Sequence, residues 1–442
     1  MYLLEQLRER AAAGRPVRVG LVGAGKFGSM FLSQAPTTGG LEVRVIADLD
    51  PDRARAACGA VGWDDARIAR TRFTPDAHEA IRADDVDVVV EATGDPAAGI
   101  VHAHAAFAAG RHIVMVNVEA DVLAGPLLAA EARAAGVVYT LAYGDQPALT
   151  CELVEWARAC GFDVVAAGKG TKYLPAYHAS TPDTVWEHYG LTAAEARAAG
   201  MNSRMFNSFL DGTKSAIEMA AIANATGLTP PPDGLRFPPC SREHLAHVLR
   251  PAEIGGQLHH KGQVEVVSSL QRDGTPLDYD IRFGVFVAFE ADSDYIARCF
   301  GEYGVKTDDS GRYAAMYKRW HLIGLELGVS VASVALRGEP TGAPTGWRAD
   351  AVAVAKRDLR AGETLDGEGG YTVSGRLMPA SRSLAEGALP MGLTHGVRLA
   401  NPVAKDGLVR WSDVAADAGD PAIRLRREME DFYRPTLLEA AE

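Results

Sequence analysis

The amino-acid sequence predicts an α/β fold: a doubly wound parallel sheet at the N-terminus, a central α+β domain, and a small, mostly-β domain at the C-terminus. The chain has 442 residues. A single hydrophobic core usually organises a shorter chain, so more than one domain is expected. From Val17 onward, runs rich in β-branched residues alternate with helix-like stretches, as in VRVGLVGAG, LEVRVIADLD, VDVVVEATG and HIVMVNVEAD. Runs that end in Gly, Asp or Asn are typical of parallel strands that are covered on both faces and carry ligands at their carboxyl ends.

Changes of pattern along the chain predict three domains, covering 1–150, 151–345 and 346–442. The central domain is expected to contain the strand DVVAAGKG, the helix AIEMAAIANATG and antiparallel strands in GQVEVVSSL and YDIRFGVFVAFEA. A helix near 312–335 is expected to pack back onto the first domain. The Gly/Pro-rich segment RGEPTGAPTGW is expected to be a linker, and the short glycine-rich runs after it predict the mostly-β domain.

Composition excludes several classes of function. A net charge of −12 and the lack of a basic stretch argue against a nucleic-acid partner. No apolar run approaches the length of a membrane span, and the first residues, MYLLEQLRERAAAGRP, lack the core of a signal peptide. The five cysteines are scattered without C-x-x-C spacing, which predicts free thiols. We therefore expect a soluble, cytoplasmic protein that acts on a small molecule.

The stretch from Gly23 to Gly28, GAGKFG, fits the pattern G-x-G-x-x-G between a predicted strand and a predicted helix. The first glycine allows a tight turn, the second lets the backbone approach a pyrophosphate, and the third permits close helix–strand contact. Asp48 ends the next strand about 20 residues later, where a carboxylate accepts hydrogen bonds from ribose hydroxyls. This context disfavours a glycine-rich turn without a ligand, so we expect a Rossmann domain that binds a nicotinamide dinucleotide.

Asp48 also bears on the choice of dinucleotide, because a carboxylate there repels a 2′-phosphate and favours NAD. Arg53 and Arg55 follow closely enough to leave NADP as an alternative, although charges after Asp-Pro also fit an exposed helix face. Two further strand ends are expected along the nicotinamide side, with turn formation as the alternative. The expected cofactor contacts are Gly23, Gly25, Lys26, Phe27, Gly28, Asp48, Thr93, Gly94 and Asn117.

Four further motifs carry a resemblance to a known family: MVNVEADVLAGP from Met115, GDQP from Gly144, AGKG from Ala167 and DGTKSAIEMAAIANATGL from Asp211. With the glycine-rich loop, they resemble the homoserine-dehydrogenase-like family over nearly the whole chain. The branch that this sequence resembles most is that of the 1-deoxy-D-xylulose 5-phosphate reductoisomerase-like enzymes. The resemblance implies a Rossmann domain, a central domain for catalysis and dimerisation, a C-terminal SAF domain and a homodimer.

Two departures from that branch bear on the reaction. Its NADPH-dependent members carry basic or small residues where this chain has Asp48, and the stretch TKYLPAYHASTPDTVWEHYG after Gly170 differs from theirs. We therefore expect hydride transfer at a C–OH/C=O centre of a small polar substrate, such as a polyol, a sugar acid, a hydroxy acid or its phosphate. A reductoisomerase is the alternative reaction, and a non-catalytic dinucleotide sensor is the alternative from a different class.

Three ionisable side chains, Lys169, Lys214 and Glu218, are the leading catalytic candidates, expected to converge on one cavity. The helix that begins near Lys214 is apolar on nearly every face, and charges on a buried helix are costly unless they line a polar cleft. An i,i+4 ion pair between Lys214 and Glu218 is the structural alternative. Homoserine dehydrogenases carry an Asp and a Lys four apart on the corresponding helix for substrate binding and proton transfer, and the order is reversed here.

Lys169 lies in AAGKG, whose glycines are expected to leave its ammonium accessible to an anion or a carbonyl oxygen. It would polarise the reacting oxygen or act as the acid and base for the alcohol proton. A surface lysine in a turn is the alternative, and the matching AGKG of the family favours the functional role.

Carboxylates after the strand HIVMVNV are a further candidate group. Glu119 and Asp121 lie where related dehydrogenases place residues between nicotinamide and substrate, so both are expected to orient a hydroxyl, and Glu119 is the fourth catalytic candidate. Together with Asp145 they would supply oxygens for a divalent cation. Helix capping by Asp121 or Asp145 is the alternative, so the spacing leaves a metal unassigned. The side chains expected to bind a polyol, carboxylate or phosphate are Asp145, His178, Arg319 and His321, with Tyr177 and Lys318 as neighbouring donors.

Overall fold

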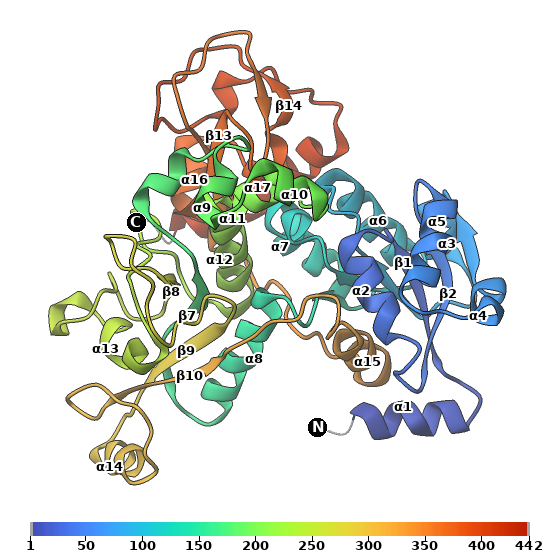
Figure 1. Ribbon diagram of the computed structural model, residues 1–442, viewed down its shortest axis with the longest axis horizontal. Coiled ribbons are helices and arrows are strands. Elements are labelled where there is room, and N and C mark those ends of the chain that lie inside the picture. Colours follow the sequence, from blue (N-terminus) through green and yellow to red (C-terminus); the bar gives the residue numbers. More distant parts are fainter. Residues whose placement is uncertain (1–2, 440–442) are drawn as a thin grey trace. The chain divides into compact units, whose positions relative to one another are not determined.

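The structure is a computed structural model that describes residues 3–439. The chain forms two compact units, each built from two segments of sequence. The first unit combines the residues up to Glu152 with His321–Thr345, and the second combines Leu153–Trp320 with Gly346–Glu442. Figure 1 traces both units, coloured along the sequence. No helix within residues 3–439 is long and apolar enough to cross a membrane.

The first unit is built on a six-stranded sheet in the order β3-β2-β1-β4-β5-β6, and all of its neighbouring strands are parallel. This is the strand order of the Rossmann fold, so the doubly wound parallel sheet predicted from the sequence is confirmed. The strands are β1 (Val17–Val22), β2 (Leu41–Ala47), β3 (Arg72–Thr74), β4 (Val88–Glu91), β5 (His112–Met115) and β6 (Tyr139–Leu141).

Aspartates define where many of the first unit's helices begin. Asp50, Asp64, Asp76 and Asp95 each accept a hydrogen bond from a backbone N–H in the first turn of the helix that follows. Such caps satisfy N–H groups that would otherwise lack a partner. These helices and their neighbours are α1 (Leu3–Ala12), α2 (Lys26–Gln34), α3 (Pro51–Ala60), α4 (Asp65–Arg70), α5 (Ala77–Arg82), α6 (Pro96–Ala108), α7 (Val118–Ala134) and α8 (Gln146–Ala159).

The helix predicted near 312–335 is only partly present. Strand β10 (Tyr313–Lys318) and a series of turns precede the helix α15, which spans Gly328–Arg337. The first part is a strand because it pairs antiparallel with β9 (Val285–Glu290), and those ladder hydrogen bonds override the helical pattern of the sequence. Val331 of α15 packs in the same hydrophobic core as β1, so α15 belongs to the first unit.

The second unit contains a four-stranded sheet in the order β10-β9-β7-β8, where β7 spans Asp163–Thr171 and β8 spans Gln263–Ser268. Strand β9 is antiparallel to β7 and β10, as expected for YDIRFGVFVAFEA, but β8 is parallel to β7. The prediction that GQVEVVSSL is an antiparallel strand was therefore wrong. The long helical connection between β7 and β8 supplies the crossover that parallel pairing requires.

The C-terminal segment of the second unit is a small β structure with two helices. Its strand pairs are β11 (Ala349–Ala355) with β13 (Val373–Pro379), and β12 (Thr364–Asp366) with β14 (His395–Arg398). The helices are α16 (Ala380–Glu386) and α17 (Pro421–Glu439). Arg426 of α17 is fully buried, and its guanidinium donates to Asp350 of β11 and to Glu430. This ion cluster fixes the last helix on the β structure.

Helix α12 (Thr213–Thr226) is the central element of the second unit. It contacts β7 and β8 of the four-stranded sheet and also β11 and β13 of the C-terminal segment (Figure 1). Contact on both sides explains why residues from Thr213 to Asn224 are nearly all buried. The remaining helices of this unit are α9 (Val185–Tyr189), α10 (Ala193–Ala198), α11 (Ser203–Leu210), α13 (Leu245–Val248) and α14 (Asp294–Glu302).

One buried carboxyl makes the stability of the first unit depend on pH. Asp121 in the first turn of α7 is fully buried and accepts a hydrogen bond of 2.9 Å from the Tyr139 hydroxyl. Its second oxygen has no partner among the described residues. Burial raises the pKa of Asp121 to about 7 from 3.8, although the Tyr139 hydrogen bond lowers it. Because the folded pKa exceeds the unfolded one, stability falls as pH rises from about 4 to about 7.

We expect Asp121→Asn to stabilise the protein at pH 8 and to have much less effect near pH 4. A difference of about three pKa units corresponds to about 4 kcal/mol at most, since each unit is about 1.4 kcal/mol. Chemical denaturation at several pH values measures this change. Asp65→Asn on the exposed start of α4 is the matched control and should show no such trend. A parallel pH profile for wild type and Asp121→Asn would contradict the assignment.

Candidate functional site

In the glycine-rich loop between β1 and α2, one motif glycine has room for a side chain, and at the other two a side chain would clash with backbone atoms. Gly23 has φ +94°, and a Cβ there would lie 2.7 Å from the Ala92 carbonyl oxygen. A Cβ on Gly28 would lie 2.2 Å from the Gly23 carbonyl oxygen. Gly25 is exposed, and a Cβ there would meet no atom within 4 Å. Two glycines therefore allow the loop to close on itself, and the third leaves space above the backbone.

That space lies at the N-terminus of a helix. Gly25 is the N-cap of α2, and no side chain of the described residues caps this helix. Backbone N–H groups and the helix dipole favour an anion at such a position. Lys26 is exposed at the first helical position, whereas Phe27 packs against the hydrophobic core of the sheet. The open cradle over Gly25 fits a pyrophosphate, with Lys26 as the nearby cation.

Asp48 follows β2 and lies directly against this loop. Its carboxylate accepts hydrogen bonds from the backbone N–H of Ala24 at 2.9 Å, from that of Asp50 at 3.0 Å and from the Arg53 guanidinium at 2.7 Å. Burial raises the pKa of Asp48, but these three donors outweigh it and lower the pKa below its ordinary value. The carboxylate is therefore charged at neutral pH and fixed beside the loop.

The two arginines after Asp48 differ in position. Arg53 pairs with Asp48, and 63% of its side chain is exposed. The Arg55 guanidinium instead lies over the ring of Phe73, 4.3 Å from its centroid. Arg53 thus offsets the negative charge of Asp48 beside the loop, and Arg55 does not.

At the end of β4, a buried glutamate organises the next loop. Glu91 is fully buried, and its carboxylate accepts from the Thr93 hydroxyl and lies 3.2 Å from His102 Nδ1. The Thr93 side chain is therefore turned back toward Glu91, while Thr93 and Gly94 are exposed on the loop. Glu91 and His102 are not among the site residues predicted from the sequence. The charged residue at the end of the apolar run VVVE could have indicated this buried cluster from the sequence.

Asn117 is the N-cap of α7 rather than an open contact. Its side chain accepts from the Ala120 N–H at 3.1 Å and donates to the Asp95 carbonyl at 2.7 Å, and the residue is 1% exposed. These bonds tie α7 to the loop after β4. A contact of Asn117 with the cofactor stays a prediction.

The carboxylates predicted to share a cation do not form a metal site. Asp121 is sealed in the core with Tyr139, and Asp145 accepts from the N–H of Gln146 at 2.8 Å at the start of α8. Glu119 is half-buried in the first turn of α7. Within residues 3–439 no group of three or more His, Cys, Asp or Glu side chains could hold a metal ion. Asp121 is instead buried, and Asp145 accepts a hydrogen bond at the start of a helix.

In the second unit, Lys169 and Glu218 form a buried ion pair. Lys169 lies in β7, the strand between β9 and β8, and its ammonium donates to the carboxylate of Glu218 on α12. The two residues are 5% and 3% exposed. The pair brings together two of the three predicted catalytic side chains.

The glycines beside Lys169 have a different role from the one expected. A Cβ on Gly168 would lie 1.8 Å from the Glu265 carbonyl oxygen, and a Cβ on Gly170 would lie 2.1 Å from the Ile281 carbonyl oxygen. Neighbouring backbone therefore occupies the space that was expected to expose the ammonium. The glycines let the chain pack closely around β7, and they do not open it to solvent.

Lys214 is half-buried at the second residue of α12, one turn before Glu218. Residues four apart lie on the same face of a helix. Lys214 is thus on the side of α12 that carries Glu218, but its convergence with Lys169 on one cavity stays a prediction.

His178 lies in a short 3-10 helix, η1 (Pro175–Ala179), and both of its ring nitrogens have partners. Nδ1 lies 2.8 Å from the Asp211 carbonyl oxygen, and Nε2 lies 3.0 Å from the Tyr173 hydroxyl. A carbonyl only accepts, so Nδ1 carries a proton and donates it to the Asp211 carbonyl. The neighbouring Tyr177 is buried in a hydrophobic cluster with Trp186, and its role as a donor stays a prediction.

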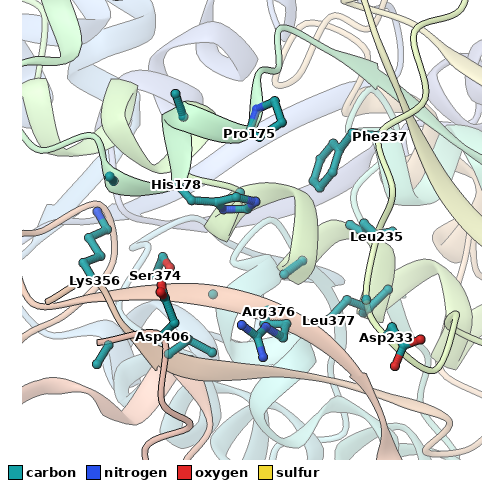
Figure 2. A pocket seen from close by; sticks show the side chains of 18 of the residues that line it. Pro175, His178, Asp233, Leu235, Phe237, Lys356, Ser374, Arg376, Leu377 and Asp406 are labelled. Carbon is teal, nitrogen blue, oxygen red and sulfur yellow. The ribbon is translucent and has the colours of Figure 1, made fainter. Parts of the chain in front are cut away.

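His178 lines a cavity of about 620 Å³ inside the second unit (Figure 2). The remaining predicted donors lie outside it. Lys318 ends β10, and the Arg319 guanidinium lies over the ring of Trp320, 4.8 Å from its centroid. His321 is half-buried and belongs to the first unit. Substrate binding by Arg319, His321 and Asp145 stays a prediction.

Comparison with known proteins gives one family match and one curated relative. Residues 144–327 match the family described as oxidoreductase DRL, catalytic domain. Over 88 residues the chain is 41% identical to inositol 2-dehydrogenase 2 of Paenarthrobacter aurescens (strain TC1). This match covers 20% of the chain and 24% of the relative, so the chain spans about a quarter of the curated protein that it matches.

Solved structures show only distant likeness. A homoserine dehydrogenase from Thiobacillus denitrificans aligns with a TM-score of 0.44 at 16% identity, covering 79% of this chain and 84% of that one. An NAD binding oxidoreductase from Klebsiella pneumoniae aligns with a TM-score of 0.29 at 21% identity, covering 37% of this chain and 44% of that one. At these TM-scores, neither structure bears on the function of this chain.

The open position in the glycine-rich loop generates a prediction. Gly25→Ala should fold with a loss of about 1 kcal/mol or less, because φ is −70° and the new Cβ meets no atom. The methyl group would occupy the space above the backbone, so the dissociation constants of NADH and NADPH should rise at least about tenfold. Fluorescence titration and thermal unfolding measure the two effects. Gly28→Ala is the contrast, since its clash should also destabilise the protein. Unchanged affinity in Gly25→Ala would place the pyrophosphate elsewhere.

Proposed function

We propose that this protein is an NAD(P)-dependent oxidoreductase that transfers hydride at a C–OH/C=O centre of a small polar substrate. The observation that carries the proposal is the loop that is open over Gly25 and flanked by Asp48, at the carboxyl edge of a Rossmann sheet. The match of residues 144–327 to an oxidoreductase catalytic domain supports it. The local identity with an inositol 2-dehydrogenase favours a polyol among the substrate classes considered.

The first unit would hold the dinucleotide. The N–H groups at the start of α2 and Lys26 would bind the pyrophosphate, and Asp48 would accept hydrogen bonds from the ribose hydroxyls. When bound, the cofactor supplies the hydride chemistry, and the protein supplies binding, orientation and charge. We propose NAD as the preferred cofactor because Asp48 is ionised, with NADP accommodated through Arg53.

The second unit would handle the proton that accompanies hydride transfer. Lys169 would donate a proton from Nζ to the substrate oxygen during reduction and accept one during oxidation. Because Lys169 is only 5% exposed, this role requires the packing around it to open toward the substrate. Glu218 fixes the ammonium and balances its charge, so the group is held ready in a dry environment. Burying two charges costs several kcal/mol per ion even when they pair, and an apolar pair of the same shape would stabilise the fold equally well or better. That cost favours catalysis over a dinucleotide sensor, which needs no such pair.

The homodimer implied by the family resemblance is part of this proposal.

The cofactor preference can be tested with two neighbouring arginines. Arg53→Ala should weaken NADP binding about tenfold, or about 1.4 kcal/mol, and should leave NAD binding nearly unchanged, because only a 2′-phosphate needs this guanidinium. Arg55→Ala is the matched control and should leave the ratio of the two affinities as it is, since its guanidinium lies over Phe73. Asp48→Asn should reduce the ratio of the affinity for NAD to the affinity for NADP. Equal losses for both dinucleotides in Arg53→Ala would show that Arg53 acts on the loop and not on the phosphate.

The catalytic pair requires a test that separates chemistry from stability. A true substrate is first found by following the absorbance of reduced nicotinamide with polyols, hydroxy acids and their phosphates. On that substrate, Lys169→Met should lower kcat by a factor of roughly 100 to 10,000. It should also destabilise the fold by about 3–5 kcal/mol, because one partner of a buried ion pair is removed.

The double variant Lys169→Met/Glu218→Gln should regain most of the lost stability and none of the activity. Lys306→Met is a control, since Lys306 is 74% exposed and lies outside the pair. A double variant that turns over at the wild-type rate would show the pair to be structural. Wild-type protein that binds the dinucleotide and reduces or oxidises none of these substrates would favour the dinucleotide sensor.

A further inference from the structure

The second unit contains a cavity whose lining comes from both of its sequence segments. Helix η1, the start of α12 and the loop 233–237 form one part of the lining, and β11, β13 and residues 405–406 of the C-terminal segment form the other. Its volume of about 620 Å³ falls within the range of small-molecule sites. A ligand there would contact the α+β part and the C-terminal part of the same unit at once.

This cavity lies on a different side of α12 from the ion pair. Gly212 and Ala216 line the cavity, whereas Glu218 carries the pair with Lys169. Successive residues of a helix are rotated by roughly 100°, so the side chains of Ala216 and Glu218, two positions apart, point roughly 160° away from each other around the axis of α12. The cavity is therefore separate from the groups to which we assign proton transfer.

Hydrogen bonds hold two side chains of the inner wall in place, Lys356 and His178, and an aspartate balances the charge of the lysine. Lys356 donates to the Asp211 carboxylate at 2.7 Å, to the Gly370 carbonyl at 2.7 Å and to the Ser180 carbonyl at 2.9 Å. Three acceptors use all three donors of its ammonium. The His178 ring is fixed by Tyr173 and by the Asp211 carbonyl. The Lys356 ammonium is therefore balanced by the Asp211 carboxylate and has no donor left for a ligand.

One wall residue is held in a strained conformation. Phe237 has φ +50°, which is rare for an aromatic residue, and its ring stacks on Tyr173 with centroids 3.9 Å apart. The buried Glu265 carboxylate accepts the backbone N–H groups of Arg236 at 3.1 Å and of Phe237 at 3.3 Å, and so holds this turn. Backbone strain of this kind persists where the surroundings fix it, often at ligand sites. The Phe237 ring gives the cavity a preformed apolar wall (Figure 2).

The lining also includes four charged side chains on the exposed part of the cavity: Asp233, Arg376, Lys405 and Asp406. Within residues 3–439 none of these four side chains forms an ion pair. Two are acidic and two are basic, so a purely anionic or purely cationic ligand would face two like charges. Ser374 adds a hydroxyl: it is 7% exposed, lines the cavity and has no side-chain hydrogen bond within the part of the chain that the structure describes.

We propose that this cavity binds a small zwitterion, specifically a free α-amino acid. Its carboxylate would pair with Arg376 and its ammonium with Asp406, and Lys405 and Asp233 are further charged residues of the same lining. Its side chain would pack against Phe237 and the neighbouring apolar wall, within reach of the Ser374 hydroxyl. The inference rests on the cavity alone and does not depend on the proposed oxidoreductase function.

The first experiment measures thermal unfolding of the full chain with each of the twenty L-amino acids at millimolar concentration. A ligand that binds only the folded state raises Tm, so at least one amino acid should raise it by a few degrees. Its N-acetyl derivative, which lacks the ammonium charge, and its amide, which lacks the carboxylate, are the matched probes and should have little effect. If no amino acid shifts Tm, or if either derivative acts as well as the parent, the proposal is overturned.

Variants then locate the site by calorimetric titration with the amino acid that acts. Arg376→Gln and Asp406→Asn should each raise the dissociation constant at least tenfold. Both side chains are exposed, and Asn tolerates the φ of +63° at position 406. Arg360→Gln on the exposed surface of the same segment is the control and should bind normally. Lys169→Met/Glu218→Gln should also bind normally. If this double variant lost binding while Arg376→Gln kept it, the amino acid would bind at the ion pair and not in the cavity, and the proposal would be overturned.

Discussion

The second unit depends on the enclosure of a single helix. Helix α12 packs against β7 and β8 on one side and against β11 and β13 on the other, so almost no face of it reaches solvent. A buried charge on a helix in this position is expensive unless it is paired. Glu218 meets Lys169, and Thr213 accepts the Gly375 N–H at 2.8 Å through its hydroxyl. The same helix therefore positions the ion pair and holds the C-terminal segment in place.

The first unit follows a simpler constraint, the space around a loop. Close backbone approaches at Gly23 and Gly28 leave Gly25 as the open position of the motif, and the Asp48 carboxylate fixes the loop through the Ala24 N–H. Asp48 is thus both a part of the loop's own structure and the residue that faces the ribose in the proposed complex. Arg53 moderates its charge, which explains why the residue type at position 48 does not by itself settle the choice of dinucleotide.

Close packing and hydrogen bonding give several predicted site residues a structural role. The glycines around Lys169 admit neighbouring carbonyl groups of the chain and not a ligand, and Asp121 is sealed in the core by Tyr139. Asn117 caps α7. These positions share one property: their residue types suit both a binding site and a structural role. The choice between the two depends on neighbours that are distant in sequence, which a pattern of spacing does not contain.

The sequence by itself determined the Rossmann sheet and the glycine-rich loop, because alternating β-branched runs, glycine spacing and the strand-ending Asp48 are local properties of the chain. It also singled out Lys169 and Glu218, since charges in apolar surroundings stand out in any sequence. Only the tertiary structure decided that these two residues pair with each other, that residues 313–318 form a strand and that β8 runs parallel to β7. It alone brought His178 and Ser374 to one cavity. Each of these features joins segments that lie far apart in the sequence, and their arrangement follows from packing and ladder hydrogen bonds rather than from local preference.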